Sequence, residues 1–201
     1  HTRISGLLNL HRLLPREVLD DVLAADLPLA SKEGFVRQLL GWREFVRHVH
    51  VATDGFRAGR SSDHEEGARP NHLASRGTLP AAWWGSSSNL ACLDRVVEDV
   101  WREGYSHHIT RLLVLSNLAT LLDVSPRELT DWFWVAYTDA YDWVVEPNVL
   151  AMGTFATGPL MTTKPYVSGA AYINRMSDYC QDCRFDPKGD CPVTNLYWAF
   201  L

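Results

Sequence analysis

The chain lacks several features that would assign it to a class directly. No apolar run in its 201 residues reaches the roughly 18 that a membrane-spanning helix needs, so we expect a soluble protein without membrane contact. Its first residues lack the apolar stretch of a secretory signal peptide, which would indicate an oxidising compartment. Alternation of apolar and polar residues, internal repeats and low-complexity tracts are also absent. These absences favour a cytoplasmic, all-α protein with almost no strand.

A strong positive charge is absent as well. The net charge is −5, so no overall field draws the chain to nucleic acid, and any DNA contact depends on a local patch. The most basic segment spans residues 57–76, and its cationic residues are Arg57, Arg60, Arg69 and Arg76, with His64 and His72. Acidic residues dilute it. By itself, this segment is more typical of a solvated loop than of a DNA-binding surface.

Cysteine is scarce, and its spacing is the most informative pattern in the chain. The four cysteines are Cys92, Cys180, Cys183 and Cys191. The last three follow a C-x2-C-x7-C pattern with Pro192 directly after it, whereas Cys92 lies far upstream. Four thiolates can bind a zinc ion or a 4Fe-4S cluster, and four cysteines can also form two disulfides. The split into three ligands and one favours the cluster over zinc and disulfides, which stay open as alternatives.

Apolar residues at three- and four-residue spacing predict a series of amphipathic helices. The predicted helices cover residues 15–25, 31–50, 89–103, 106–123, 125–141, 168–180 and 193–201. Ser31 is expected to cap the second helix. Ser125, Pro126 and Glu128 predict a capping box with proline in the first turn. Residues 52–87 and 149–165 are rich in glycine and proline and predict loops.

Five segments, taken in order, resemble the flavin-binding domain of the photolyase/cryptochrome superfamily. They read HTRISGLLNL, GWREFVR, CLDRVVEDVWREGYSHHITRLLVLSNLATLL, DWFWVAYTDAYDWVVEPNV and YCQDCRFDPKGDCPVTNLYWAFL. The first is similar to that family's phosphate-binding loop, the second to its Trp-Arg-Glu-aromatic signature, and the last to its cluster loop. Together with the upstream cysteine, the set is most similar to the iron–sulfur bacterial cryptochromes and photolyases.

The resemblance extends from residue 1 to residue 201 and implies one helical domain that holds FAD and a 4Fe-4S cluster. Residues 52–87 would form a long loop, and residues 178–201 the cluster loop and terminal helix. We expect the superfamily's N-terminal α/β antenna domain to be absent, and no antenna pigment is implied. We also expect a monomer whose partner is UV-damaged DNA, contacted in part by the arginines of residues 57–76.

The resemblance also implies residues that bind the flavin. Those expected to contact FAD are Thr2, Ser5, Arg43, Arg111, Asp139, Asp142 and Asn148. Thr2 and Ser5 would offer hydroxyl groups to the pyrophosphate. Arg111 and Asp139 would form an ion pair beside the flavin ring and tune its electronics. Without the resemblance, the hydroxyl and amide residues of this set are more typical of helix capping, and Arg43 of a surface ion pair.

A second set of residues is expected to act in catalysis, namely His107, His108, Trp132 and Trp84. One of the two histidines would be the general acid toward a (6-4) photoproduct, whose repair needs a proton to move with the electron. Trp132, Trp84 and also Trp134 would relay electrons between surface and flavin, because indoles oxidise easily. Without the resemblance, the histidines are more typical of packing or capping. Tryptophans are more typical of core packing, which we expect for Trp101.

The sequence therefore predicts a light-driven DNA repair flavoprotein. The specific hypothesis is a lyase that reverses (6-4) pyrimidine photoproducts by electron transfer from excited reduced FAD. One alternative is a cryptochrome-like blue-light photoreceptor that uses the same flavin and tryptophans. Another is an iron–sulfur nucleic-acid-binding module that resembles the large subunit of primases and needs no flavin.

Overall fold

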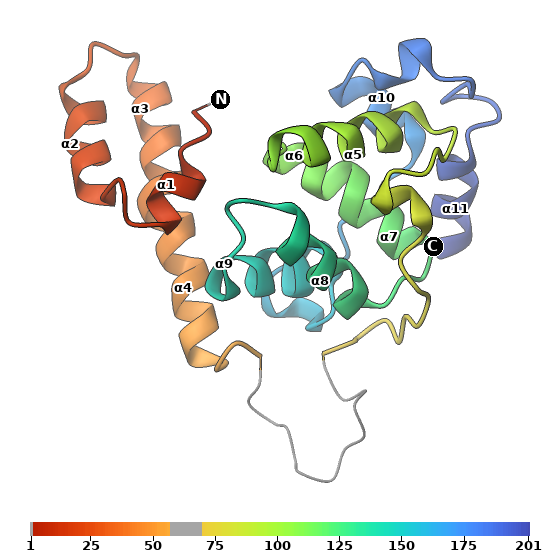
Figure 1. The fold of residues 1–201 in the computed structure, drawn as a ribbon, viewed down its shortest axis with the longest axis horizontal. Helices are drawn as coiled ribbons and strands as arrows, with labels where there is room; N and C mark the ends of the chain where they lie inside the picture. Colours follow the sequence, from red (N-terminus) through yellow and green to blue (C-terminus); the bar gives the residue numbers. More distant parts are fainter. Residues whose placement is uncertain (1, 57–69) are drawn as a thin grey trace, which may run out of the picture.

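The computed structural model describes residues 2–56 and 70–201, and its regular elements are helices (Figure 1). One parallel bridge, between Gly77 and Val124, is the only extended pairing within those ranges. The predicted all-α class is therefore confirmed. No helix in the same ranges has the length and apolar character needed to cross a membrane. Outside the described residues lie four members of the expected basic segment, namely Arg57, Arg60, His64 and Arg69.

The N-terminal part is a group of helices that leads into one long helix (Figure 1, red to orange). Its elements are α1 (Ser5–Asn9), α2 (Pro15–Ala24), α3 (Leu29–Val36), the π-helical segment η1 (Arg37–Trp42) and α4 (Arg43–Ala52). Right-handed helical angles continue through both joints, at Val36 and at Trp42, so α3, η1 and α4 form one continuous helix. The helix predicted over residues 31–50 is thus confirmed. The cap expected at Ser31 is wrong, because the helix already begins at Leu29, directly after the extended Pro28.

A second and larger group of helices follows residue 70 (Figure 1, green to blue). It comprises η2 (Ala81–Trp84), α5 (Ala91–Glu103), α6 (His108–Thr110), η3 (Arg111–Ser116), α7 (Asn117–Leu121), α8 (Pro126–Ala136), α9 (Asp142–Val145), η4 (Glu146–Gly153), η5 (Gly158–Leu160), α10 (Ala170–Met176), η6 (Tyr179–Asp182) and α11 (Pro192–Phe200). Pro126 begins α8 as predicted. The predicted capping box is wrong, because the Ser125 side chain makes no cap and the Glu128 carboxylate instead accepts the Leu79 amide at 3.5 Å.

The core of the larger group is built from apolar side chains of η2, α5, η3, α7 and α8. Its most buried members include Trp83, Val100, Leu115, Leu129 and Phe133. Each such side chain stabilises the fold by about 1.5–3 kcal/mol when it leaves water. Helix α5 packs on η3, and α8 packs on η4. The core therefore holds in fixed positions the elements that carry most of the candidate site.

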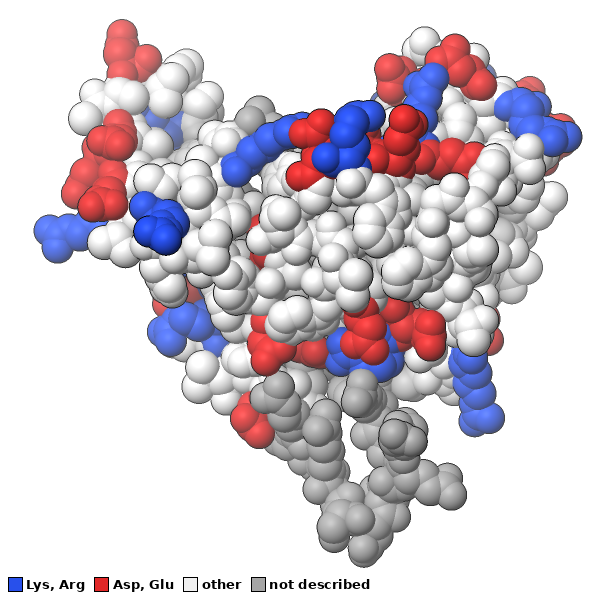
Figure 2. Space-filling view, viewed as in Figure 1, with Lys and Arg blue, Asp and Glu red and all other residues white. Residues whose placement is uncertain are grey.

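Charged side chains on the viewed surface are mixed in sign. Figure 2 shows blue and red groups side by side along the upper edge, over α5. There Arg102 forms an ion pair with Asp99, and Arg3 forms one with Glu103 at 2.9 Å. Because each cation has an acidic neighbour, this edge of the molecule is not a broad positive surface for DNA.

The loop predicted over residues 149–165 is wrong in its first part, where η4 continues α9 and packs against η3. The two segments approach closely because residue 153 is glycine. A Cβ atom at Gly153 would lie 2.8 Å from Ser116 Oγ and 3.2 Å from Ser116 Cβ. The glycine that suggested a loop is therefore a packing residue between two helical segments.

The substitution Gly153→Ala should destabilise the protein by about 1–3 kcal/mol, because the added methyl group overlaps the buried Ser116. Urea unfolding followed by circular dichroism measures this loss. The matched control is Gly41→Ala in η1, where an added Cβ meets no atom within 4 Å and alanine favours the helix. Equal stability of the two variants would contradict the packing role of Gly153.

Candidate functional site

A cavity of about 750 Å³ lies between the N-terminal helices and the larger helical group. This volume is within the range of about 300–1,000 Å³ that small-molecule sites occupy. Five of the residues expected to bind FAD line it, namely Thr2, Ser5, Arg111, Asp139 and Asn148. His107 and His108 line it too, whereas Arg43 and Asp142 do not. Most of the expected site residues thus meet at one cavity although they are far apart in sequence.

All three π-helical segments of the described ranges contribute to this cavity. Their lining residues are Gln38 and Trp42 of η1, Arg111, Leu112 and Ser116 of η3, and Asn148, Val149 and Met152 of η4. π-helical turns are rare and occur frequently at functional sites. The convergence of three such segments is independent evidence that this cavity is the functional site.

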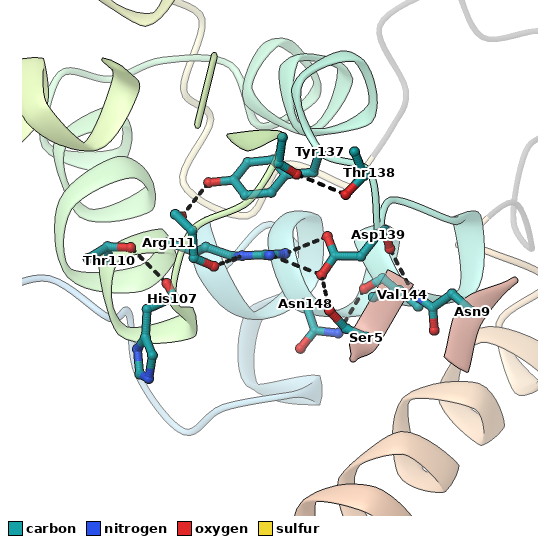
Figure 3. A network of polar contacts seen from close by, with 12 residues as sticks. Ser5, Asn9, His107, Thr110, Arg111, Tyr137, Thr138, Asp139, Val144 and Asn148 are labelled. Atoms are coloured by element: carbon teal, nitrogen blue, oxygen red, sulfur yellow. Dashed lines mark hydrogen bonds and ion pairs between the residues drawn. The ribbon is translucent and has the colours of Figure 1, made fainter. Parts of the chain in front are cut away.

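The centre of the cavity wall is a buried ion pair between Arg111 and Asp139 (Figure 3). Helix α8 ends at Ala136, and the chain then turns so that Asp139 faces the first residue of η3. The two terminal nitrogens of Arg111 donate to the two carboxylate oxygens of Asp139, each at 3.0 Å. Ser5 Oγ donates to the same carboxylate at 2.7 Å. The carboxylate is only 6% exposed, so this bidentate pair is largely removed from solvent.

Aromatic rings enclose the Arg111 side chain. Its guanidinium lies 4.1 Å from the centre of the Tyr137 ring and 5.1 Å from that of Tyr105, and its Nε donates to the Ser106 carbonyl at 3.0 Å. The Tyr137 hydroxyl pairs with Ser106 Oγ at 2.7 Å. Burial raises the pKa of both tyrosines, so they stay neutral. Arg111 is therefore held in place as a permanent positive charge in the cavity wall.

Hydrogen bonds extend from Asp139 to the N-terminal helices. Asn9 Nδ2 donates to the Asp139 carbonyl at 2.8 Å, and Asn9 Oδ1 accepts from Arg43 at 2.7 Å. Arg43 also donates to the Leu8 carbonyl at 3.1 Å, and its guanidinium lies 4.5 Å from the centre of the Trp143 ring. Burial lowers the pKa of Arg43. In this structure Arg43 joins α1 to α4, so its contact with flavin stays a prediction.

Asn148 and Asp142 take different positions. The amide of Asn148 accepts from Trp42 Nε1 at 3.0 Å and donates to the Val144 carbonyl at 2.8 Å, which joins η4 to η1. Asp142 is the first residue of α9 and lies outside the cavity lining.

Ser5 is not the cap of α1, since Ile4 precedes the helix and the Ser5 hydroxyl donates a hydrogen bond to Asp139. Capping therefore does not explain the side chain of Ser5.

The two adjacent histidines have different surroundings. His107 precedes α6, where its Nδ1 accepts the Ile109 amide at 3.0 Å, and in Figure 3 its ring points away from the Arg111–Asp139 pair. His108 stands on the cavity wall and is exposed to the open cavity. Desolvation there, and then the charge of Arg111, lowers the pKa of His108 to about 4. His108 is therefore neutral at pH 7 in the absence of a ligand.

A chain of aromatic rings leads from the cavity to the surface. Phe133 and Tyr137 line the cavity as a stacked pair, and the buried Trp132 lies 5.3 and 5.9 Å from their ring centres. Trp101 lies 6.3 Å from Trp132 and 6.0 Å from Trp84, which is 54% exposed. The structure thus joins the two expected relay residues through a third tryptophan that we had expected only to pack in the core.

One backbone atom positions this tryptophan chain. The Trp83 carbonyl accepts from Trp101 Nε1 at 3.0 Å and from Trp132 Nε1 at 2.9 Å. Trp101 is half exposed, so core packing does not account for it. Trp134, the other relay residue expected from sequence, has no contact with these rings in the described part of the chain.

The four cysteines belong to three places in the fold: Cys92 lies on α5, Cys180 and Cys183 lie on and directly after η6, which contacts α5, and Cys191 directly precedes α11. All four are free thiols, so the structure contains neither of the two disulfides that one alternative required. Burial, and then the neighbouring Cys180, raises the pKa of Cys92 to about 12, and Cys183 and Cys191 add smaller effects of the same sign. In residues 2–56 and 70–201, however, no three His, Cys, Asp or Glu side chains are arranged to hold a metal ion. The sulfurs are thus close enough to interact but do not converge on a point.

The substitution Asp139→Asn should destabilise the protein strongly, because it leaves the Arg111 charge buried without a counter-charge. Removing one partner of a buried ion pair costs about 3–5 kcal/mol. The free energy of unfolding in urea measures it. Glu103→Gln is the matched control, since it breaks an exposed pair with Arg3 and should change stability little. Similar losses in the two variants would show that the buried pair does not hold the site together.

Comparison with known proteins identifies the family. A family model described as the FAD binding domain of DNA photolyase matches residues 35–191. The chain is 40% identical over 179 residues to a (6-4) photolyase of Agrobacterium fabrum, a match that covers 87% of this chain and 33% of that protein. It is 34% identical over 89 residues to an uncharacterized protein of Acanthamoeba polyphaga mimivirus, with 44% of this chain and 69% of that protein covered. The chain thus spans a third of the length of the (6-4) photolyase. Because the family model covers most of the chain, including the three π-helical segments, the protein belongs to the photolyase/cryptochrome family and contains its flavin-binding domain.

Proposed function

We propose that the chain is the flavin-binding part of a light-driven DNA repair enzyme that reverses (6-4) photoproducts. The observation that carries the proposal is the cavity of about 750 Å³ in which the buried Arg111–Asp139 pair lies among aromatic rings. The 40% identity to a (6-4) photolyase supports the choice of lesion. When bound in the cavity, reduced FAD supplies an electron to the damaged bases after absorbing blue light.

The residues of the cavity fit such a cofactor. Arg111 cannot turn away from the cavity, because its donors and its flat face are engaged by Asp139, Ser106 and Tyr137. A fixed positive charge of this kind stabilises an electron-rich ring without any rearrangement when charge develops. The hydroxyl of Thr2 stands at the same cavity and would donate to the pyrophosphate, whereas the Ser5 hydroxyl, also at the cavity, donates to Asp139.

His108 is the candidate proton donor. It lines the cavity, whereas the His107 ring accepts a backbone amide at the start of α6. A donor must carry its proton, and the pKa of about 4 leaves His108 neutral at pH 7. The negative charge of bound DNA would raise this pKa, because a nearby anion favours the imidazolium. Proton donation would thus be coupled to the arrival of the lesion.

The substitution His108→Asn should reduce repair of (6-4) photoproducts by about a hundredfold or more, which is the range for loss of a general acid. Photoreduction of FAD should stay intact, because the aromatic chain is untouched. Repair is measured by the return of undamaged bases under blue light, with flavin absorbance as the second readout.

The comparison variant is His107→Asn, which keeps a side chain able to cap α6 and should lose less repair. Parent protein that photoreduces its flavin but repairs no lesion would support the photoreceptor alternative instead. Unchanged repair in the His108 variant would contradict the proton-donor role.

Electron supply to the flavin would use the rings of Trp132, Trp101 and Trp84. Successive ring centres along this path are about 6 Å apart, and the last ring is exposed. Trp101→Phe should therefore slow photoreduction of bound FAD by an external reductant, because phenylalanine oxidises far less easily than tryptophan. Transient absorption after a light pulse measures this.

Trp134→Phe is the matched control, because Trp134 is a partly exposed tryptophan outside the ring path. It should leave the photoreduction rate unchanged. Equal rates in the Trp101 variant and the parent protein would exclude Trp101 from the path.

The four cysteines would hold a 4Fe-4S cluster, and this remains part of the proposal. An all-thiolate donor set suits iron–sulfur centres or zinc. The proposal rests on the number and spacing of the four free thiols, because in residues 2–56 and 70–201 their side chains are not arranged around a metal site. Its role would be structural, since Cys92 belongs to α5 and Cys191 directly precedes α11.

A further inference from the structure

A second cavity lies outside the candidate flavin site, between the chain before α10, helix α10 itself and α11. Its volume is about 730 Å³, and its lining includes Tyr166, Tyr172, Tyr197 and Trp198. We call it the aromatic groove. Trp198 is 68% exposed, Tyr166 is 47% exposed and Tyr172 is 37% exposed. Large rings held this far out in water do not stabilise the core, so their position calls for a ligand.

Two lysines line the aromatic groove, and the Asp186 carboxylate lies beside one of them, where it accepts the Lys188 amide at 2.8 Å. The chain has only three lysines, and two of them, Lys164 and Lys188, line this groove. No carboxylate occurs among the described residues that line it. Next to it, the Arg175 guanidinium lies 4.9 Å from the centre of the Tyr172 ring. The net charge of the chain is −5, so these cations form a local exception. They suit a ligand that is an anion and that also has flat apolar faces.

The groove adjoins the candidate flavin cavity. Tyr166 belongs to the lining of both, at the point where the chain passes from η5 toward α10. A polymer that places one of its units at the cavity would therefore have the groove beside its neighbouring units. Aromatic faces with cations along one track are the features that bind single-stranded nucleic acid.

We propose that the aromatic groove binds single-stranded DNA, namely the unpaired nucleotides next to the damaged site. The inference rests on the proposed function, because removal of a lesion from the duplex leaves neighbouring bases unstacked. Trp198 and Tyr172 offer their faces to bases, and Lys164 and Lys188 neutralise phosphates. Stacking on these rings would replace part of the stacking that the duplex loses. The contact is independent of base sequence, because every base has a flat face.

The test uses the purified protein with its cofactors, in the dark, and an undamaged twelve-residue thymidine oligonucleotide as the probe. Fluorescence anisotropy of a labelled probe gives the affinity. Trp198→Ala should weaken binding about tenfold, and Trp198→Phe should restore most of it, since base stacking on one ring is worth about 1–3 kcal/mol. Because Trp198 is largely exposed, both variants are expected to fold.

Salt dependence gives a second, independent readout. Replacing both Lys164 and Lys188 by alanine should lower the slope of log affinity against log salt by about 1.4, since each phosphate contact to a single strand contributes about 0.7. The matched control for charge is Lys32→Ala. Lys32 is the third lysine and lies on α3, where it donates to the Leu23 carbonyl at 2.9 Å. It should leave both affinity and slope unchanged.

The inference is overturned if the Trp198 and double-lysine variants bind the oligonucleotide as the parent protein does. It is also overturned if the Trp198 fluorescence, taken as the difference from Trp198→Phe, is shielded from acrylamide without DNA, because a protein segment would then fill the groove. Failure of the proposed function is a separate result, in which the parent protein does not repair (6-4) lesions. If the parent protein repairs the lesion and the variants bind the oligonucleotide unchanged, only the proposed role of the aromatic groove is refuted, and the proposed function stands.

Discussion

The bidentate contact between Arg111 and Asp139 constrains the rest of the site, because Asp139 is buried, Arg111 is mostly so, and each fixes further groups. Arg111 orients the Tyr105 and Tyr137 rings, and Asp139 holds Ser5 through its carboxylate and Asn9 through its carbonyl. Burying two charges costs solvation that their attraction only partly recovers. The pair therefore contributes less to stability than to position. It determines where α1 stands relative to η3, and so determines the shape of the cavity between them.

The three π-helical segments determine which side chains reach the cavity. An α-helix would place its residues at even spacing, whereas a π-helical turn inserts an extra residue and shifts the face that follows. In η1, η3 and η4 the shifted faces all meet at one cavity. The apolar core of α5, α7 and α8 includes side chains of η3 and η4. Local irregularity is thus confined to the wall that has a function.

The sequence predicted the helices well because their evidence is periodic and redundant. The helices around residues 31–50 and 89–103 each rest on several apolar positions, so no single residue decides them. The cap at Ser31 and the capping box at Ser125 each rested on one or two side chains. In the structure the first helix begins earlier, at Leu29, and the Ser125 side chain makes no cap. The glycine at residue 153 suggested a loop, but it serves close packing against Ser116. Such a contact between distant segments cannot be recognised from local composition.

For the site, the resemblance predicted the Arg111–Asp139 ion pair, and the structure confirms that pair. It did not predict Trp101, because a tryptophan on the apolar face of an amphipathic helix gives the same pattern whether it packs or relays electrons. Nor could it predict the three π-helical segments, since one inserted residue barely changes a 3.6-residue period. The spacing of the four cysteines predicted one metal site, but spacing does not determine where the side chains point, and in the described residues they do not surround a common point.

The Trp83 carbonyl has a consequence for how this protein can vary. It accepts hydrogen bonds from the indole N–H groups of both Trp101 and Trp132, so one peptide oxygen constrains the separation of these two rings. Every amino acid carries that oxygen. Substitution at residue 83 can change the packing around the rings but cannot delete the acceptor that aligns them. The distance between the two rings, on which electron transfer would depend, is therefore held by the main chain. Substitution of the side chain at residue 83 leaves that acceptor in place.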